Sequence, residues 1–328
     1  MKVLVTGGTG FTGSHLVMRL VERGHQVRVL SRNATPKTDH LRKMGAEICF
    51  GDIIDKDTVN KVTRGAELVY HLAAAWQNIA VPKKVYWNVN VGGTQNILDA
   101  CLEENVDRYV HCSTTGVLGN ISNPPADENY PYGPGDIYQE TKCEGEKLVL
   151  RYFNEKGFPG VVLRPCPIYG PGDQRMLRLF KLIKNRKFIM IGKGNVHYQQ
   201  VYIDDLINGF ELCGQKKQAI GQIYMVGGNE SPTLNELISI IAEVLNVPAP
   251  NRRFPFVWPI WFASWLCKVT CKPLGIQPPI FPRRVDWFRK NRDFDISKVK
   301  EELDYEPKTD LRTGIKNTVD WYNKEGLL

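Results

Sequence analysis

Tyr138 and Lys142 have the residue types and the spacing that acid–base chemistry needs. They lie in a segment, 137–154, whose apolar spacing predicts a helix, so the i,i+4 spacing places the phenol and the ammonium on one face. A phenol with a pKa of ~10 is a poor base at neutral pH, and lowering that pKa by about three units takes ~4 kcal/mol of preferential stabilisation of the phenolate. A neighbouring positive charge in a partly desolvated cleft supplies such stabilisation. A Tyr and a Lys at this spacing are common on helices, so the pair indicates a catalytic function only in combination with the residues around it.

A hydroxyl group near this pair would hold a reacting oxygen in place. The run from His111 to Val117 follows an apolar strand and is rich in hydroxyl side chains. Thr114 is the first candidate and Ser113 the second, because either could hydrogen-bond a carbonyl or alcohol oxygen beside the phenol. The candidate catalytic residues are therefore Tyr138, Lys142, Thr114 and Ser113.

A glycine-rich turn, Thr6-Gly7-Gly8-Thr9-Gly10-Phe11-Thr12-Gly13, follows a short apolar run and precedes an amphipathic segment. Its three-residue glycine spacing is typical of a dinucleotide-binding turn, where backbone N–H groups approach a pyrophosphate at the positive end of the next helix. Such a triplet taken alone also fits an ordinary tight turn. The residues expected to contact a dinucleotide here are Gly7, Gly10, Phe11, Thr12 and Gly13.

Two further strand ends fit a bound dinucleotide. Gly51-Asp52 closes the third predicted strand, where a carboxylate can accept from an adenine amino group; the alternative is that Asp52 caps the next helix. The small residues of His71-Leu72-Ala73-Ala74-Ala75 close the fourth strand and leave room for a flat ring. The additional contacts expected are Ile53, Leu72, Ala73 and Ala74.

The end of the second predicted strand indicates which nicotinamide cofactor is used. An acidic residue there would accept from the ribose 2′-hydroxyl and repel a 2′-phosphate, but this chain has Ser31 followed by Arg32. A hydroxyl and a planar cation favour a phosphate, so we expect NADP(H) to be preferred, with NAD(H) possible. The alternative is that Arg32 is a solvated surface residue.

Charge, cysteines and hydropathy exclude several classes of protein. The net charge of +8 is spread along the chain, so nucleic-acid binding is not indicated. The eight cysteines have irregular spacing, which is typical of core residues in a reducing compartment, and no metal-binding constellation is found. Neither a signal peptide nor a transmembrane segment is predicted, so the expected location is the cytoplasm.

Short β-branched runs alternate with amphipathic segments through the first half of the chain, which predicts βαβ units and an α/β fold. Six strands with helices between them fit a doubly wound parallel sheet, the Rossmann fold. We expect a dinucleotide-binding domain over 1–171, to which 200–226 returns with two late strands, at 201–203 and 223–226. A smaller, interleaved C-terminal substrate domain would comprise 172–199 and 227–328, with a terminal helix near 311–324.

Taken together, these motifs resemble an extended short-chain dehydrogenase/reductase, a superfamily that includes nucleotide-sugar epimerases and dehydratases, 3β-hydroxysteroid dehydrogenase-like enzymes and dihydroflavonol reductases. The resemblance covers almost the whole length. The matching segments include Thr6–Gly13, Gly51-Asp52, His71–Ala74, Asn90–Thr94, Ser113-Thr114, Tyr138–Lys142, Leu163–Pro165, Ile168–Asp173 and Tyr202–Asp205.

The resemblance implies a mechanism and an assembly. Hydride would pass between the nicotinamide and a substrate carbon while Tyr138 exchanges the proton, Lys142 binds the nicotinamide ribose and Thr114 orients the oxygen. Asn90 and Pro165 would add cofactor contacts. The resemblance also implies a homodimer formed by two helices of each subunit, near 83–104 and 137–154.

The substrate is expected to be hydrophobic, because two polar contacts of the nucleotide-sugar branch are missing. Pro167 stands where many of those enzymes place an asparagine, and no arginine precedes the strand at 201–203. An aromatic stretch from Phe254 to Leu266 suits a flat substrate such as a sterol or isoprenoid. Two other interpretations of that stretch are core packing and a peripheral membrane contact through 254–272.

Three functions therefore stay open. The first is an NADP-dependent oxidoreductase acting on the secondary alcohol or ketone of a hydrophobic small molecule. The second is a nucleotide-sugar epimerase or dehydratase with a tightly bound cofactor, in which Arg175, Arg283 or Arg284 would hold the phosphates. The third is a cofactor-sensing binding protein, which the presence of Tyr138 and Lys142 disfavours.

Overall fold

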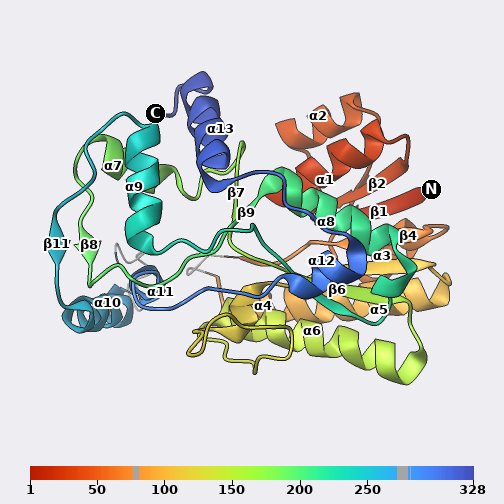
Figure 1. Cartoon of the computed structure of the whole chain (residues 1–328). Coiled ribbons are helices and arrows are strands. Elements are labelled where there is room, and N and C mark those ends of the chain that lie inside the picture. The colour runs from red at the N-terminus through yellow and green to blue at the C-terminus, as the bar shows by residue number, and fades with distance from the viewer. Residues whose placement is uncertain (77–80, 272–279, 281) are drawn as a thin grey trace.

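The chain folds around a seven-stranded parallel sheet, as the computed structural model of residues 1–76, 81–271, 280 and 282–328 shows (Figure 1). The strand order is β10-β6-β5-β4-β1-β2-β3, the doubly wound arrangement extended by one strand, which confirms the predicted Rossmann fold. The strands are β1 (Lys2–Thr6), β2 (Gln26–Ser31), β3 (Glu47–Phe50), β4 (Leu68–His71), β5 (Arg108–Cys112), β6 (Gly160–Pro165) and β10 (Ile223–Val226).

Helices cover both faces of the sheet, which is why its strands are almost continuously apolar. Along β1, Val3 and Val5 face a core shared with one set of helices, while Leu4 faces a second core on the opposite side. The first face is covered by α1 (Phe11–Glu22), α2 (Pro36–Lys43) and α8 (Ile203–Gln215). The second is covered by α3 (Lys56–Thr63), α5 (Gly93–Glu103) and α6 (Ile137–Lys156).

The helix expected near 83–104 is observed in three consecutive parts. It runs as α4 (Lys83–Trp87), a π-helical turn η1 (Asn88–Gly92) and then α5. A π turn inserts an extra residue into a helix and is frequent at functional sites. Here it carries Asn90, which is buried.

A smaller group of elements packs beside the carboxyl ends of the strands (Figure 1). It contains the two-stranded sheets β7 (Ile168–Tyr169) with β9 (Val201–Tyr202) and β8 (Met190–Ile191) with β11 (Arg253–Phe254). Its helices are α7 (Leu177–Lys184), α9 (Leu234–Val244), α10 (Val257–Cys271), α11 (Pro282–Asp286) and the expected terminal helix α13 (Leu311–Lys324), whereas α12 (Ser297–Leu303) packs against β10 at the edge of the main sheet. Two short 3-10 turns, η2 (Thr115–Leu118) and η3 (Lys217–Ala219), complete the order of elements.

One of the two late strands does not join the main sheet as predicted. The strand β10 pairs with β6, but β9 pairs with β7 in a separate two-stranded sheet. The chain enters α8 at Ile203, directly after β9, and the acidic residues Asp204 and Asp205 in the first turn of α8 favour a helix start there. The strand expected over 201–203 is therefore shorter and lies elsewhere, whereas the proposed domain boundaries stay a prediction.

Within the described part of the chain, no helix combines the length and the hydrophobicity that crossing a membrane requires.

Candidate active site

The glycine turn between β1 and α1 is shaped so that side chains would not fit. Gly7 has a φ of +74°, and a Cβ there would lie 2.7 Å from the backbone nitrogen of Ala73. A Cβ on Gly13 would lie 2.2 Å from the carbonyl oxygen of Gly7. Gly10 begins α1 without a side-chain cap, and no acidic residue lies in the first turn. The positive end of α1 is thus open to an anion, and these residues fit the pyrophosphate of a dinucleotide.

The loop after β4 is tied to this turn and to the helix that carries Tyr138. The N–H of Leu72 donates to the Thr6 carbonyl at 3.1 Å, and that of Ala73 donates to the Thr6 hydroxyl at 3.3 Å. The Asn90 side chain accepts from the N–H of Ala75 at 2.7 Å and donates to the Thr141 hydroxyl at 2.9 Å. Asn90 therefore positions the loop against α6, and its predicted contact with the cofactor stays a prediction.

At the end of β3, the alternative interpretation of Asp52 as the cap of the next helix is wrong, because Asp55 is the N-cap of α3 and its side chain accepts from the N–H of Asp57. One carboxylate oxygen of Asp52, Oδ1, accepts from the N–H of Ile54 at 3.2 Å, which forms the local turn. The residue is only partly buried, and its expected contact with an adenine amino group stays a prediction. Ile53 is buried, and its side chain packs against Gly93 at the start of α5.

The end of β2 carries Ser31 and Arg32, the two residues expected to contact the 2′ position of the cofactor ribose. Ser31 is buried, and its hydroxyl donates to the carbonyl of Asn33 at 3.1 Å. Arg32 is exposed, and the described structure gives its guanidinium no hydrogen bond or ion pair. A cation held next to the strand end without a protein partner fits a 2′-phosphate, although it also fits the alternative of a solvated surface residue.

A single cavity of about 1690 Å³ joins the glycine turn to the candidate catalytic residues. Ligand pockets usually measure ~300–1,000 Å³, so this one has room for a dinucleotide and a second molecule. The predicted site residues that line it are Gly7, Gly10, Phe11, Thr12, Gly13, Leu72, Ala74, Ser113, Thr114, Tyr138 and Pro165. Those predicted but placed outside the lining are Ser31, Arg32, Asp52, Ile53, Ala73, Asn90 and Lys142.

Tyr138 and Lys142 share α6, and both meet the end of β5. Asp136 caps the helix, its side chain accepting from the N–H of Gln139, so Tyr138 lies in the first turn beside the cavity. The Lys142 ammonium is buried and donates to the Cys112 carbonyl at 2.6 Å, next to Ser113 and Thr114. Burial lowers the pKa of Lys142, while Cys112 and Glu146 act to raise it.

Burial raises the pKa of the Tyr138 phenol, and the Cys112 thiol adds to this. The sequence predicts that the Lys142 ammonium and the oxidised nicotinamide supply the opposing charge. In the structure the largest opposing contribution comes from Arg283, whose guanidinium lies over the Tyr138 ring at 5.3 Å from its centroid. Arg283 in turn pairs with Asp136 at 3.2 Å. No local pattern links residues so distant in sequence, and Arg283 had been considered only as a phosphate ligand.

The two candidate hydroxyls have different partners. The Thr114 hydroxyl accepts from the N–H of Gly116 at 3.1 Å and lines the cavity, so its own proton is available to a substrate oxygen. The Ser113 hydroxyl is buried and donates to the Glu146 carboxylate. The geometry therefore favours Thr114 as the residue that orients a substrate.

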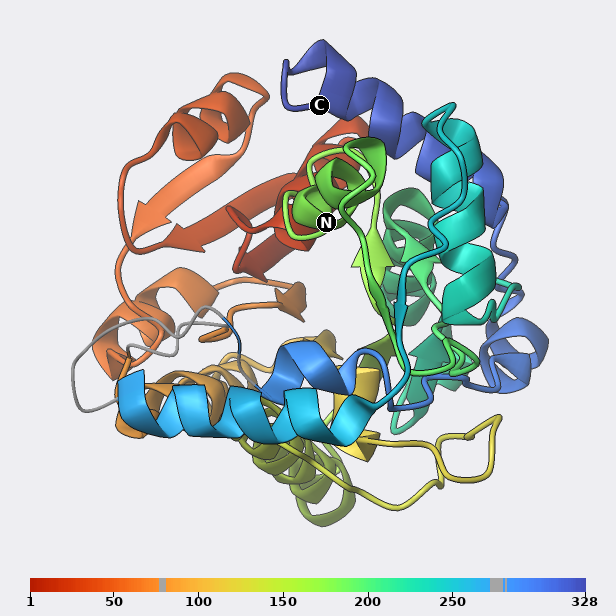
Figure 2. The same ribbon diagram turned by 90° about the vertical axis from the view of Figure 1, so that its left-hand side faces the viewer.

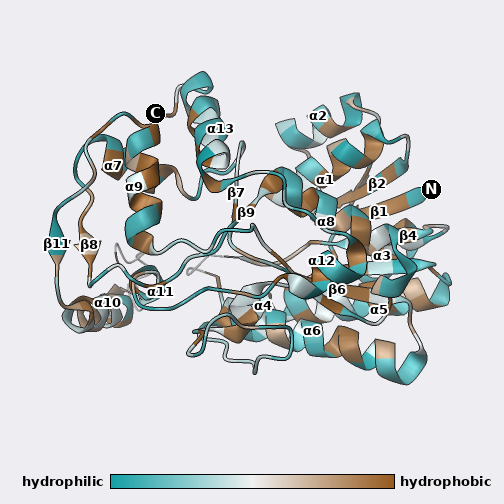
Figure 3. Ribbon diagram, viewed as in Figure 1, coloured by the Kyte–Doolittle hydropathy of each residue, from teal (hydrophilic) through white to brown (hydrophobic). Residues whose placement is uncertain are grey.

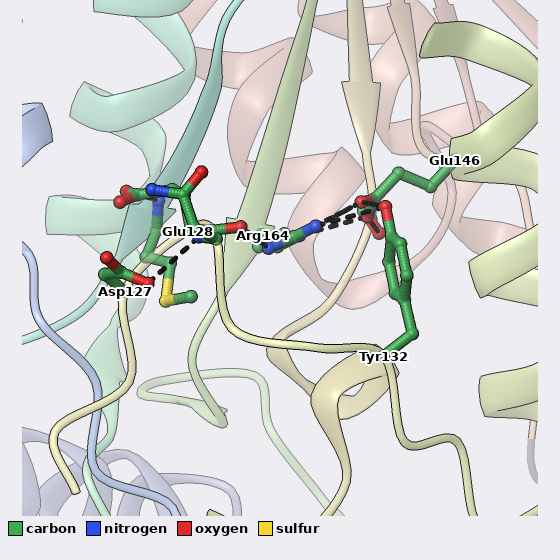
Figure 4. A network of polar contacts seen from close by, with 8 residues as sticks. Asp127, Glu128, Tyr132, Glu146 and Arg164 are labelled. Atoms are coloured by element: carbon green, nitrogen blue, oxygen red, sulfur yellow. Dashed lines mark hydrogen bonds and ion pairs between the residues drawn. The ribbon is translucent and has the colours of Figure 1, made fainter. Parts of the chain in front are cut away.

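Glu146 belongs to a buried polar network behind the site, which sequence reasoning missed (Figure 4). It forms a salt bridge with Arg164 on β6 and accepts from the Tyr132 hydroxyl at 2.8 Å. Arg164 also donates to the carbonyl of Glu128 at 2.9 Å, so the loop that leads into α6 is fixed to the sheet. The only signal in the sequence is that Glu146 follows Lys142 by four residues on one helix face.

The far wall of the cavity is apolar and basic. The smaller group of elements beside the carboxyl ends of the strands, called the smaller lobe from here on, contributes apolar side chains to this wall. They are Leu179, Leu182, Phe188, Ile191, Val285, Trp287 and Phe288. The basic residues of the lining are Lys83, Arg175, Arg178, Lys268, Arg283, Arg284, Lys290 and Arg292, against Asp136, Glu140, Asp173 and Asp286. The aromatic residues expected to form this wall, Phe254 to Leu266, are absent from the described lining, and most of them are exposed.

Comparisons with known proteins agree with this geometry. The chain is 32% identical to 3beta-hydroxysteroid-dehydrogenase/decarboxylase isoform 1 of Arabidopsis thaliana, over 98% of this chain and 79% of that protein. It is 28% identical to the decarboxylating sterol-4-alpha-carboxylate 3-dehydrogenase of Candida albicans, over 99% and 98%. Its fold matches that of UDP-glucuronic acid 4-epimerase from Bacillus cereus, solved in complex with NAD, with a TM-score of 0.79, 27% identity and 99% of both chains covered.

A family model provides the most general of these matches, because it covers the sheet and the candidate site together. Residues 3–227 match the model of the NAD dependent epimerase/dehydratase family. This span includes the glycine turn, Thr114, Tyr138, Lys142 and both late strands. The resemblance drawn from the motifs is confirmed, and the chain belongs to the NAD dependent epimerase/dehydratase family, as an oxidoreductase-type enzyme of the extended short-chain branch.

Proposed function

We propose that the protein is an oxidoreductase that transfers hydride between NADP(H) and a secondary alcohol or ketone of a hydrophobic molecule. The observation that carries the proposal is the shared cavity, in which Tyr138 and Thr114 face the same space as the glycine turn. When bound, the nicotinamide would accept or donate the hydride. The rest of the chemistry is the protein's own, and it consists of holding the substrate oxygen and moving one proton.

The proton transfer is assigned to Tyr138. As a phenolate it would take the proton of the substrate hydroxyl during oxidation, and as a phenol it would return it during reduction. Thr114 would donate to the same oxygen and fix its distance from the phenol. Lys142 is anchored on the Cys112 carbonyl, and we assign its ammonium to binding the nicotinamide ribose, as the family resemblance implies.

The substrate class is supported by the lining and by the relatives. Trp287, Phe288 and Phe188 provide a broad apolar wall, and of two relatives that match nearly the whole chain one is named for a 3beta-hydroxysteroid and the other for a sterol-4-alpha-carboxylate. Pro167 also lines the cavity, and a proline side chain offers no hydrogen bond to a sugar nucleotide.

The basic residues beside Tyr138 suggest that the substrate also carries an acid group. Arg283 lies over the phenol ring, and one relative is named for a sterol 4-carboxylate. A carboxylate on the carbon next to the reacting carbon would fall within reach of such a guanidinium, which binds carboxylates through two parallel hydrogen bonds. Oxidation of that alcohol gives a 3-oxo acid, a class of compound that loses carbon dioxide readily.

A nucleotide-sugar epimerase or dehydratase is the second candidate, favoured by the basic residues of the smaller lobe. Arg175 lies over the Phe11 ring at 5.1 Å, close to the glycine turn, and Arg283 and Arg284 line the other side of the cavity. These side chains could also hold a diphosphate. An enzyme of this kind would retain its cofactor during purification, because the cofactor is regenerated in each turnover.

One experiment separates these possibilities. The purified protein is tested for co-purified cofactor, then for thermal shifts and turnover with NADP⁺ and four compounds: a 3β-hydroxysterol, its 4-carboxylate, a UDP-sugar and UDP alone. We expect turnover of the sterols, with the 4-carboxylate preferred, and little stabilisation by UDP. A large thermal shift with UDP alone together with retained cofactor would establish the second candidate instead.

The role of Tyr138 is tested with a matched pair of variants. Tyr138→Phe removes only the phenol oxygen and should lower the rate ~10²–10⁴-fold. Tyr198→Phe makes the same change elsewhere in the cavity lining and should leave the rate within about threefold, because the Tyr198 ring packs against Trp287 and its hydroxyl has no part in the assigned proton transfer. Equal rates for both variants would remove Tyr138 from the proton-transfer step.

A further inference from the structure

The helix α10 exposes its large apolar side chains and buries a polar one. Ser264 is fully buried, whereas Trp258 is 72% exposed and Phe262 is 52% exposed. Trp265, Leu266 and Val269 are exposed as well. A helix on the surface of a water-soluble protein normally has the opposite arrangement, with its apolar stripe facing the core.

The exposed residues of α10 form one continuous stripe. Their positions, 258, 262, 265, 266 and 269, follow the i, i+4, i+7, i+8, i+11 spacing of a single helix face. Phe254 and Phe256, just before the helix, extend the stripe and are exposed too. Figure 3 colours much of α10 as hydrophobic, and Figure 2 shows the helix lying across the outer face of the smaller lobe. Contiguous exposed apolar surface of this kind marks an interaction site.

The charges carried by the segment that forms the stripe have one sign. From residue 244 to residue 285 the sequence contains no Asp or Glu, but it contains Arg252, Arg253 and Lys268 within or beside the stripe. All three are exposed. Lys184, Arg186 and Lys187 lie near β8, the strand that pairs with β11 at the start of the stripe, and are exposed as well. The surface is therefore complementary to a negatively charged partner with an apolar interior.

We propose that α10 and the residues just before it dock onto the surface of a membrane that contains anionic lipid. Trp258, Phe262 and Trp265 would enter the boundary between headgroups and acyl chains, where tryptophan is favoured, while the basic residues contact the headgroups. The helix lies in the interface and does not cross the bilayer. Because Lys268 of α10 also lines the cavity, the docked face would border the place where a substrate enters. The proposal goes beyond the proposed function and does not depend on it.

The test is flotation of the full-length protein with lipid vesicles. Vesicles of phosphatidylcholine alone are compared with vesicles containing phosphatidylserine, at low and high salt. We expect binding to the phosphatidylserine vesicles that weakens with salt, because exposed charges are screened. No binding to either kind of vesicle, or equal binding to both, would overturn the proposal.

Variants of the exposed face identify the contact. Trp258→Ser with Phe262→Ser and Trp265→Ser should abolish flotation, and Arg252→Gln with Lys268→Gln should weaken it about 25-fold, at roughly fivefold for each charge. Trp87→Ser with Ile220→Ser removes exposed apolar residues elsewhere and should leave binding unchanged. Thermal melts confirm that each variant is folded.

Sedimentation of the same variants tests whether the stripe on α10 binds a second copy of this chain instead of a membrane. If α10 is a lipid contact, the oligomeric state should be identical in the wild type and in the triple variant. An assembly that dissociates when Trp258, Phe262 and Trp265 are replaced would show that the stripe is a protein interface, and it would overturn the proposal.

Discussion

Replacing Arg283 by glutamine should raise the pKa at which Tyr138 works as a base. The guanidinium lies over the phenol ring at 5.3 Å from its centroid and opposes the effect of burial. Two unit charges about 6 Å apart interact by roughly 1.4 kcal/mol at an effective dielectric constant of about 40, intermediate between a protein surface and water, and this corresponds to about one pKa unit. Because Asp136 partly neutralises the guanidinium, we expect an upward shift of about half a unit to one unit.

The assay is the pH dependence of kcat/KM, followed through the absorbance of the reduced nicotinamide. Oxidation needs the phenolate, so its rate should rise with pH through the pKa of Tyr138, and that rise should move to higher pH in Arg283→Gln. The neighbouring variant Asp136→Asn gives the opposite test. Removing its negative charge should lower the same pKa, because Asp136 acts to raise the pKa of Tyr138.

A shift of the profile in the same direction in both variants, or an unchanged profile in Arg283→Gln, would refute the assigned role of Arg283. A change in KM without a shift of the profile would instead mean that Arg283 only binds the substrate. Arg289→Gln serves as a control, because Arg289 lies over Trp261 and pairs with Asp286 rather than with residues at the phenol.

Three more predictions follow from other parts of the molecule. Arg32→Ala should weaken NADPH binding about 10- to 100-fold and spare NADH, measured by titration calorimetry, with the exposed Arg42→Ala as control; equal losses for both cofactors would remove the assignment. Glu146→Gln breaks the buried pair with Arg164 and should lower the free energy of unfolding by about 3–5 kcal/mol in urea titrations, whereas a loss near zero would mean that the pair is not structural. Burial lowers the pKa of His71 to about 3 and that of His111 well below its usual value, so both stay neutral when folded and gain a proton only on unfolding. Stability should therefore be full above about pH 6.5 and fall by about 2 kcal/mol for each histidine between pH 7 and pH 5, and equal unfolding free energies at these two pH values would contradict this.

The part of the fold that is local in sequence could be predicted. Runs such as Val3-Leu4-Val5 are buried on both faces, so composition alone identifies the strands. The close approach of Gly7 and Gly13 to neighbouring backbone explains why glycine spacing marked the cofactor turn. The α6 face that carries Tyr138 follows from helical periodicity.

Features that depend on distant segments could not be predicted. The contact of Arg283 with Tyr138 joins two lobes, and the ion pair of Glu146 with Arg164 joins a helix to a strand. The strand β9 was misassigned because an apolar triplet does not specify which sheet it joins. The stripe on α10 was recognised as apolar, but only the fold shows that it points outward and not into the cavity.

The side chain of Asn90 holds two parts of the site at a fixed distance from each other. Its hydrogen bonds to Ala75 and Thr141 connect the loop after β4, where the cofactor is expected to bind, to the turn of α6 that carries Tyr138. A displacement of the loop would therefore move this turn of α6 as well. The distance between the expected cofactor position and Tyr138 is thus set by a few short hydrogen bonds and not by the flexibility of two separate segments. Enlarging the substrate cavity by replacing apolar residues of the smaller lobe, with Arg283 kept, should therefore leave the distance between cofactor and Tyr138 unchanged, so the substrate preference could be altered without altering the reaction.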